Sequence, residues 1–410
     1  MSSITQIKKS KNYEINTSIK HYLDPDYIYV PIDKDDKINI KNHETVYKGS
    51  VILKKENHNY YSSISGEVIG ATKITNYKNE ELNAIVIEND FKEKSEKSVG
   101  AKKYIETYNK EEVIELVTKF NATKRDLKGK ILIVNGIDMD PFEENYSYII
   151  KKYADKLLEC IDALCEIFKI KKCFLAVKNS DSENVKMLID NIGTYPSIEL
   201  KLMPDTYPIG KKEILIKKLT NERSKKLGVM YFNIEEILAI YEVLKKKKPL
   251  CEKLITISGD LVEKSKIVNA KIGVLVKDLL EKNVNITKSD YLIVVNGLLN
   301  GHEITENCVL TSEIRSIFIM SKNVEVEHDC INCGLCFKNC PVNVNPKYVR
   351  ENNDKKSAEY AKKCINCGLC TYLCPSKINL SRRLRWKMFI WEIIILFLKL
   401  VYTTLLVYYL

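Results

Sequence analysis

The sequence lacks an apolar signal segment, because its 410 residues open with the polar and basic stretch MSSITQIKKSKN. It nevertheless contains 13 cysteines. In a chain without a secretion signal, cysteines point to a reducing compartment, where thiolates stay available to bind metal. We therefore expect the chain to work in the cytoplasm.

A nucleic-acid-binding signature is also missing, although the formal net charge is +11, from 65 Lys and Arg against 54 Asp and Glu. The lysines are scattered in short runs such as residues 245–248, and no nucleic-acid-binding motif accompanies them. This pattern predicts a solvated basic surface and no nucleic-acid partner.

The length exceeds what one hydrophobic core usually supports, so several domains are expected. Residues 26–90 read as short β segments between turns, which predicts a β domain over residues 1–95. Strand and helix patterns alternate up to residue 250, which predicts an α/β layer with parallel strands over residues 96–250. Residues 251–322 read as a compact α+β unit. The fold class is therefore multidomain α/β and α+β.

Two copies of one cysteine motif, CINCGLCFKNCP and CINCGLCTYLCP, define a further domain at residues 323–381. Their C-x2-C-x2-C-x3-C-P spacing is that of bacterial ferredoxins with two 4Fe-4S clusters. A structural zinc site usually joins two separated C-x2-C pairs and has no use for the third cysteine or for the repetition. The motif therefore predicts two 4Fe-4S clusters and electron transfer.

In such motifs the fourth cysteine binds the cluster of the other motif. Gly334 and Gly368 lie inside the loops that wrap the clusters, and Pro341 and Pro375 end them. The remaining cysteines lie in apolar runs and are expected to be buried: Cys160, Cys165, Cys173, Cys251 and Cys308. The expected cluster ligands are Cys330, Cys333, Cys336 and Cys374 for one cluster, and Cys364, Cys367, Cys370 and Cys340 for the other.

Five short segments before the cysteines are similar to segments of one known protein family and follow the same order as in that family. They are YSSISGEVIG (61–70), ILIVNGIDMDPF (131–142), MPDTYPIGKKE (203–213), YFNIEEI (231–237) and LITISGD (254–260). Together they make residues 20–382 resemble the C subunit of Rnf-type ion-translocating ferredoxin:NAD oxidoreductase complexes. The resemblance implies a barrel-sandwich β domain, a Rossmann-like α/β layer related to the flavoprotein subunit of respiratory complex I, a β-grasp domain and a two-cluster ferredoxin-like domain.

The flavin-binding loop of that flavoprotein subunit, G-x-G-G-x-G-F-P-T, is missing here. Its place is taken by TKFNATKRDLKG, which has no glycine cluster to bring backbone amides close to a phosphate. The sequence therefore does not predict a bound FMN. Asp138 and Asp140 match two acidic residues of the family, which implies that they could bind a ribose or an amide of a nucleotide. The alternative is that they cap the helix expected to begin near residue 146.

The final 23 residues, 388–410, are largely apolar and follow a basic run at residues 382–387. As a helix they would extend about 35 Å, enough for a bilayer core. Glu392 and Lys399 share one stripe with Arg385 and Thr403, which suits an interfacial helix or one packed on a membrane partner. A full span and a helix buried in the protein's own core are the alternatives. The basic flank predicts that the cluster domain lies at the cytoplasmic face of the cell membrane.

These features predict an iron–sulfur electron-transfer subunit of an Rnf-like membrane-associated redox complex. Its partners would be the other subunits of that complex and a soluble carrier such as ferredoxin or NADH. Because the two clusters of this chain would only pass single electrons, no catalytic acid or base is expected. Two alternatives stay open: an NADH dehydrogenase subunit with bound FMN, and a docking scaffold whose clusters are structural.

Overall fold

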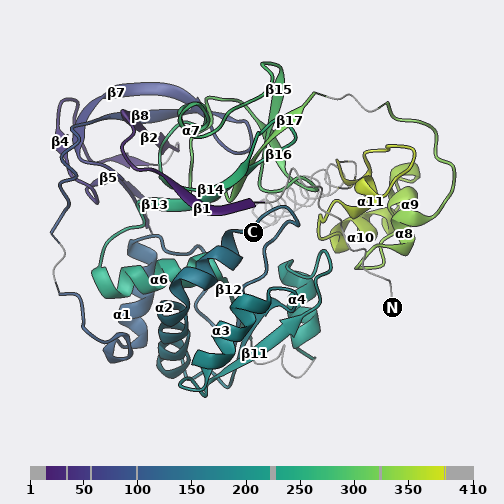
Figure 1. Ribbon diagram of the computed structural model, residues 1–410, viewed down its shortest axis with the longest axis horizontal. Coiled ribbons are helices and arrows are strands. Elements are labelled where there is room, and N and C mark those ends of the chain that lie inside the picture. The colour runs from purple at the N-terminus through teal and green to yellow at the C-terminus, as the bar shows by residue number, and fades with distance from the viewer. Residues whose placement is uncertain are drawn as a thin grey trace, which may run out of the picture. The chain divides into compact units, whose positions relative to one another are not determined.

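The computed structural model describes residues 15–33, 36–55, 58–97, 100–221, 228–322, 326–382 and 384. The chain forms two compact units (Figure 1). The large unit consists of residues 8–205 and 215–322, and the cysteine unit consists of residues 1–7, 206–214 and 323–410.

The β segments expected at residues 26–90 are strands, and they form two antiparallel sheets at the upper left of Figure 1. β7 and β8 pair with a bulge between Val68 and Gly70. Gly66 is required where β7 crosses β8, because a Cβ there would lie 1.8 Å from the carbonyl oxygen of Glu88. The sheets are β2 (Tyr27–Ile32), β8 (Glu81–Asn89), β7 (Gly66–Thr75) and β4 (Thr45–Val46), and β3 (Lys37–Ile38), β5 (Val51–Lys55) and β6 (His58–Tyr61).

The expected α/β layer contains a sheet of four strands, all parallel, in the order β11, β10, β9, β12. All five residues of β9 are buried, which explains its continuous run of apolar residues. Helices α1 and α6 begin with capping boxes, Asn109 with Glu112 and Asn233 with Glu236. The elements are η2 (Ile105–Thr107), α1 (Lys110–Lys119), β9 (Ile131–Asn135), α2 (Asn145–Ile167), β10 (Lys172–Lys178), α3 (Ser182–Ile192), β11 (Ile198–Met203), α4 (Lys212–Leu219), β12 (Val229–Asn233) and α6 (Ile234–Lys246).

The third part of the large unit is a mixed sheet of six strands in the order β1, β14, β13, β17, β15, β16. Its first strand comes from residues 15–22, which the sequence placed in the β domain at 1–95, and it pairs in parallel with β14. No local pattern could reveal a partner so distant in the chain. The elements are β1 (Ile15–Tyr22), β13 (Glu252–Ser258), β14 (Ser265–Lys271), α7 (Val276–Asn283), β15 (Tyr291–Val295), β16 (His302–Ile304) and β17 (Ser316–Ser321).

A buried ion network joins this sheet to the β domain. The Lys271 side chain is only 1% exposed, and its Nζ lies 3.2 Å from Glu252 Oε1 and 3.0 Å from Glu93 Oε1. Lys48 Nζ lies 2.8 Å from the same Glu252 oxygen. Burial alone would raise the pKa of Glu252, but the hydrogen bond from Lys48 and the charges of Lys48 and Lys271 outweigh burial and lower this pKa to about 2.

We expect Glu252→Gln to lower the free energy of unfolding by about 1–3 kcal/mol, because it leaves the buried Lys271 with one carboxylate fewer. A lowered carboxyl pKa stabilises the fold above the unfolded pKa of about 4.3 and loses that effect as pH falls towards 2. The difference between parent and variant in urea unfolding should therefore shrink from pH 5 downwards. Glu166→Gln, at an exposed position of α2, is the matched control. Equal stability of parent and Glu252→Gln at pH 7 would contradict this account.

The cysteine unit is built from short helices around a small core of Val344, Val349, Ala361 and Leu384. Residues 206–214 group with it, although the sequence placed them in the α/β layer at 96–250. Within the described residues, no helix is long and apolar enough to cross a membrane. The apolar tail at 388–410, with Glu392 and Lys399, lies outside those residues. The helices are α8 (Leu335–Lys338), α9 (Pro346–Glu351), α10 (Lys355–Lys363) and α11 (Leu369–Tyr372).

Candidate functional site

The two cysteine motifs fold into the same backbone conformation. In the first motif Asn332 and Gly334 have positive φ angles of 57° and 72°, and in the second Asn366 and Gly368 have 52° and 78°. Asparagine and glycine are the residues that adopt this left-handed region most readily. The identical letters C-I-N-C-G therefore encode two loops with left-handed residues at the same two places.

A short helix follows each loop and delivers the fourth cysteine to an equivalent place. α8 begins after Gly334 and α11 begins after Gly368. The backbone N–H of Cys340 donates to the carbonyl of Phe337 at 3.1 Å, and that of Cys374 donates to the carbonyl of Thr371 at 3.1 Å. The repetition extends to the turn beyond, where Asn343 and Lys377 both have a φ of 56°.

The fourth cysteine of the first motif lies with the first three cysteines of the second. Cys340 borders the same apolar cavity as Cys364, Cys367 and Cys370, and it acts electrostatically on the last two thiols. Cys336 also borders this cavity, whose walls include Pro341, Val344 and Leu369. The crossed ligand assignment for the second cluster stays a prediction.

The two motifs differ in burial. Cys367 is 8% exposed, whereas Cys333 is exposed and has exposed apolar neighbours in Ile331 and Phe337. Burial raises the pKa of the Cys367 thiol to about 11 and raises the pKa of Cys336 as well. Without metal these thiols are therefore protonated at neutral pH, so binding of iron must release their protons.

Backbone amides point at the sulfur atoms. The N–H of Val344 donates to Cys340 Sγ at 3.2 Å, and the N–H of Asn366 donates to Cys364 Sγ at 3.4 Å. Such hydrogen bonds stabilise the thiolate form and tune the potential of an iron–sulfur cluster. In the described part of the chain, no three His, Cys, Asp or Glu side chains stand at the spacing of a single metal ion. A cubane binds each thiolate at a different iron, so it requires a wider spacing than one ion.

One residue from outside the cysteine domain reaches the second motif. The hydroxyl of Tyr207 donates to the carbonyl oxygen of Cys367 at 2.6 Å, and Tyr207 is only 8% exposed. The positive charge of Lys211 acts on the Cys367 thiol in the direction that lowers its pKa, although burial dominates. Sequence reasoning matched the stretch MPDTYPIGKKE to a family segment but did not place it at a cluster. No local signal marks the contact, because the partners are 160 positions apart.

The two acidic residues considered for a nucleotide are buried and already hold backbone amides. Asp138 Oδ1 accepts from the N–H of Tyr146 at 2.9 Å, which is the helix-capping alternative that the sequence offered. Asp140 accepts from the N–H groups of Phe142 at 3.1 Å and Leu299 at 3.2 Å. The nucleotide role of both residues stays a prediction.

The place of the missing glycine loop is occupied by side chains. Thr123 Oγ1 donates to Glu236 Oε1 at 2.7 Å, and Arg125 Nε lies 2.8 Å from Glu236 Oε1 and 2.9 Å from its Oε2. Asn233 caps the N–H of Glu236 at 2.8 Å, so the start of α6 already has an acceptor and a negative charge. A flavin phosphate would meet a carboxylate where it requires free amides. These residues therefore do not fit a flavin phosphate.

Three family models match the chain. An RnfC barrel sandwich hybrid domain matches residues 5–92, a Nuo51 FMN-binding domain matches residues 112–242, and a 4Fe-4S dicluster domain matches residues 329–378. The chain is an RnfC-like protein. The dicluster match covers both cysteine motifs, so the cofactors of this RnfC-like chain are 4Fe-4S clusters.

The similar curated proteins are C subunits of redox complexes. One belongs to the ion-translocating oxidoreductase complex of Haemophilus influenzae and is 28% identical over 252 residues, which are 57% of this chain and 30% of that protein. Another belongs to the proton-translocating ferredoxin:NAD(+) oxidoreductase complex of Clostridium ljungdahlii and is 22% identical over 374 residues, which are 83% of this chain and 81% of that protein. The chain thus spans less than a third of the length of the Haemophilus relative.

A solved NAD+-reducing [NiFe]-hydrogenase is similar in part. The match covers 48% of this chain and 41% of the hydrogenase chain, with 17% identity and a TM-score of 0.38. A likeness of this size supports no conclusion about activity.

Cys340→Ala and Cys374→Ala should each damage a different cluster. From the crossed ligand rule, Cys340→Ala should impair the cluster held by Cys364, Cys367 and Cys370, and Cys374→Ala should impair the other. The parent should contain about eight irons and eight acid-labile sulfides per chain. Each variant should keep roughly half of its iron, and electron paramagnetic resonance of the reduced protein should show which signal is lost.

Cys308→Ala is the control for these variants, since Cys308 is a buried cysteine outside both motifs and should leave both signals intact. Loss of the opposite signal in each variant would reverse the assignment. Four irons in the parent, or zinc in place of iron, would refute the two-cluster site.

Proposed function

We propose that this chain is the electron-transfer subunit of an Rnf-like membrane-associated complex and relays single electrons through two 4Fe-4S clusters. The observation that carries the proposal is the placement of Cys340 beside Cys364, Cys367 and Cys370. Two motifs that share ligands hold their clusters close together, which is what rapid transfer between them requires. A docking scaffold with structural clusters would not need that proximity.

The difference in burial gives the relay two distinct ends. The cluster of the second motif is the inner one, enclosed by Cys367, Leu369 and the Tyr207 hydroxyl. The cluster of the first motif is the outer one, since Cys333 is exposed and Ile331 is 67% exposed. We infer that the redox partner, a carrier such as ferredoxin or another protein of the complex, exchanges electrons at the outer cluster.

The match to the Nuo51 FMN-binding domain favours an alternative, an NADH dehydrogenase subunit with bound flavin. The ion pair of Arg125 with Glu236 opposes it, because it fills the start of α6. We propose that the chain works without flavin and receives its electrons from another protein. Asp138 and Asp140 would then serve the fold.

Cofactor analysis and a redox titration test this function together. The anaerobically purified chain should show two one-electron transitions, negligible flavin in an acid extract and little NADH-driven reduction of a dye. Stoichiometric flavin would establish the dehydrogenase alternative instead. Clusters that stay redox-silent across the accessible potential range would favour the scaffold.

We also propose the finer domain assignment, apart from β1 and residues 206–214, which group with other parts of the chain. It comprises a barrel-sandwich domain at 1–95, a Rossmann-like layer at 96–250, a β-grasp domain at 251–322, a two-cluster domain at 323–381 and a membrane-associating helix at 382–410. The basic flank before the apolar tail supports a place at the cytoplasmic face of the cell membrane.

Truncation after Arg383 should turn a membrane-bound chain soluble and keep both clusters, since all eight ligand cysteines precede the cut. Each apolar side chain moved from lipid to water costs about 1.5–3 kcal/mol, so the tail should dominate partitioning. The measurement is fractionation of both chains in cells that lack the partner proteins of the complex. Equal fractionation would mean that the tail needs a partner to hold Glu392 and Lys399.

A further inference from the structure

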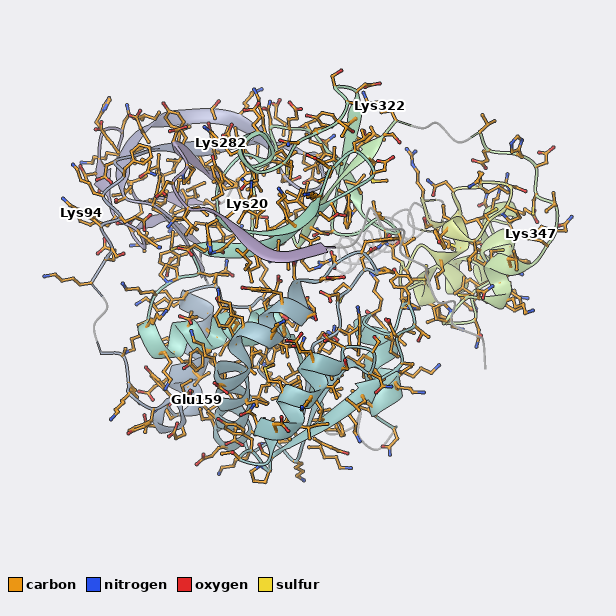
Figure 2. All side chains as sticks on the ribbon, viewed as in Figure 1. Lys20, Lys94, Glu159, Lys282, Lys322 and Lys347 are labelled. Carbon is orange, nitrogen blue, oxygen red and sulfur yellow. The ribbon has the colours of Figure 1, made fainter. Side chains whose placement is uncertain are left out.

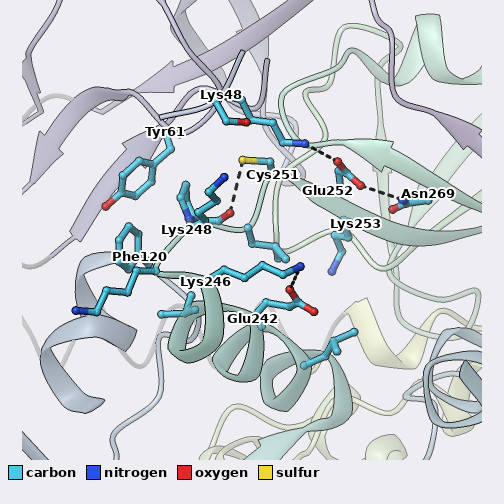
Figure 3. A pocket seen from close by; sticks show the side chains of 18 of the residues that line it. Lys48, Tyr61, Phe120, Glu242, Lys246, Lys248, Cys251, Glu252, Lys253 and Asn269 are labelled. Carbon is cyan, nitrogen blue, oxygen red and sulfur yellow. Dashed lines mark hydrogen bonds and ion pairs between the residues drawn. The ribbon is translucent and has the colours of Figure 1, made fainter. Parts of the chain in front are cut away.

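The large unit contains a cavity of about 780 Å³, lined by residues of the β domain, of α6 and of the segment that leads into β13 (Figure 3). Its wall includes Lys119 and Phe120 at the end of α1, so it belongs to the region that stands in place of the family's glycine loop. None of the eight cluster cysteines borders it. The contacts that can act on the electron relay lie within the cysteine unit.

The two cysteine motifs begin with the same letters, C-I-N-C-G-L-C, at residues 330–336 and 364–370. Their backbones are also alike, with left-handed asparagine and glycine residues at the same two places. Loops of the same sequence and conformation would by themselves give their clusters similar reduction potentials. Because the potential also depends on hydrogen bonds and on solvent exposure, any difference between the two clusters comes from groups outside these loops.

Burial is one such difference, and it works against the second motif. Cys367 is buried, whereas Cys333 is exposed. Reduction adds one negative charge to a cluster, and a negative charge is less stable where water is excluded. Burial alone would therefore give the inner cluster a lower reduction potential than the outer cluster, and an electron that arrives at the outer cluster would stay there.

The segment at 206–214 has the opposite influence on the inner cluster. The hydroxyl of Tyr207 donates to the carbonyl oxygen of Cys367 at 2.6 Å, so the hydroxyl proton offsets the partial negative charge of that buried carbonyl. Burial opposes a negative charge at the Cys367 sulfur, and the positive charge of Lys211 favours it. Both groups therefore stabilise the reduced state of the cluster that Cys367 is expected to bind.

The local fold fixes this segment. The N–H of Ile209 donates to the carbonyl of Thr206 at 3.0 Å, and the N–H of Lys211 donates to the carbonyl of Pro208 at 2.9 Å. The four residues 207–210 are all buried, and Lys211 itself is half-buried. The hydroxyl is therefore held at the Cys367 carbonyl, and water screens the lysine charge only in part.

The first motif has no equivalent of the Tyr207 contact. In the part of the chain that the structure describes, no protein group donates to the carbonyl of Cys333. Lys347 lies near this loop, since its Nζ donates to Asn332 Oδ1, but it stands at the surface of the cysteine unit (Figure 2). Its side chain is 38% exposed and its Nζ lies 3.8 Å from Glu351 Oε2, so water and a carboxylate both weaken its charge.

We propose that Tyr207 and Lys211 are positioning residues of electron transfer, which raise the reduction potential of the inner cluster and so offset its burial. This inference rests on the proposed electron relay. Tyr207 acts through the backbone of Cys367, and Lys211 acts through its charge. The two potentials are thereby brought close enough for an electron to pass inward from the exposed outer cluster.

Potentiometric titration of the full-length chain, purified anaerobically and followed by electron paramagnetic resonance, tests this inference. Tyr207→Phe keeps the ring and removes the donor, and Lys211→Gln removes the charge. Each should lower the same one of the two midpoint potentials and leave the other unchanged. The ratio of reduced to oxidised cluster at a given potential should fall by about three- to tenfold, where tenfold corresponds to about 59 mV for one electron. Lys211→Arg keeps the charge and should keep the parental midpoints.

The matched controls are Tyr104→Phe and Lys186→Gln, which make the same chemical changes at exposed positions of the large unit and should leave both midpoints unchanged. Iron content and thermal unfolding of each variant verify the fold. If Tyr207→Phe loses iron, the comparison of Lys211→Gln with Lys211→Arg decides.

The inference is overturned if neither midpoint falls in variants that keep their full iron content, or if both midpoints move equally. In that case the parent still shows two one-electron transitions, and the proposed relay stands. Clusters that stay redox-silent in the parent would refute the relay itself and this inference with it.

Discussion

The cysteine unit depends on one constraint under the crossed ligand assignment that we propose: neither motif can complete a cluster alone. Three thiolates spaced two residues apart leave one iron of a cubane without a protein ligand, and the fourth cysteine lies past a helical turn where it faces the other motif. The two loops must therefore fold against each other before either cluster is closed. This requirement explains why the loops repeat one another in their positive φ angles, in their short helices and in the hydrogen bonds of Cys340 and Cys374.

The segment at 206–214 also contributes to the cysteine unit, because one of its residues contacts the second of these loops. Tyr207 belongs in sequence to the stretch between β11 and α4, yet its hydroxyl holds the backbone of Cys367. A hydroxyl that withdraws electron density from this carbonyl acts within the ligand loop of the inner cluster, where a change in local dipoles shifts the reduction potential. The cluster domain is thus completed by a segment from a distant part of the chain, which couples the inner cluster to the chain that leads into α4.

How much of the structure can be predicted from the sequence depends on how far apart in the chain the interacting residues lie. The wrapping loops were predictable because the C-I-N-C-G letters carry both the ligands and the left-handed residues within five positions. β9 was predictable because a strand buried on both faces shows as an unbroken apolar run. The partner of β1, the contact of Tyr207 and the network of Thr123, Arg125 and Glu236 were not predictable. Each joins residues far apart in the chain, and no periodic pattern records such pairs.

The start of α6 carries a network of side chains whose charge opposes a phosphate at that place. The helix dipole and the free amides at a helix start attract a phosphate, but here Asn233 and Glu236 satisfy each other's amides in a capping box. The carboxylate of Glu236 then holds Arg125, whose guanidinium carbon lies 5.0 Å from the centre of the Tyr231 ring. The arginine is thereby fixed between a carboxylate and an aromatic face. An incoming phosphate would have to break the ion pair and uncap the helix, and it would gain no glycine backbone in return. This network thus places a carboxylate and a guanidinium at the start of α6, next to the parallel pair of β9 and β12.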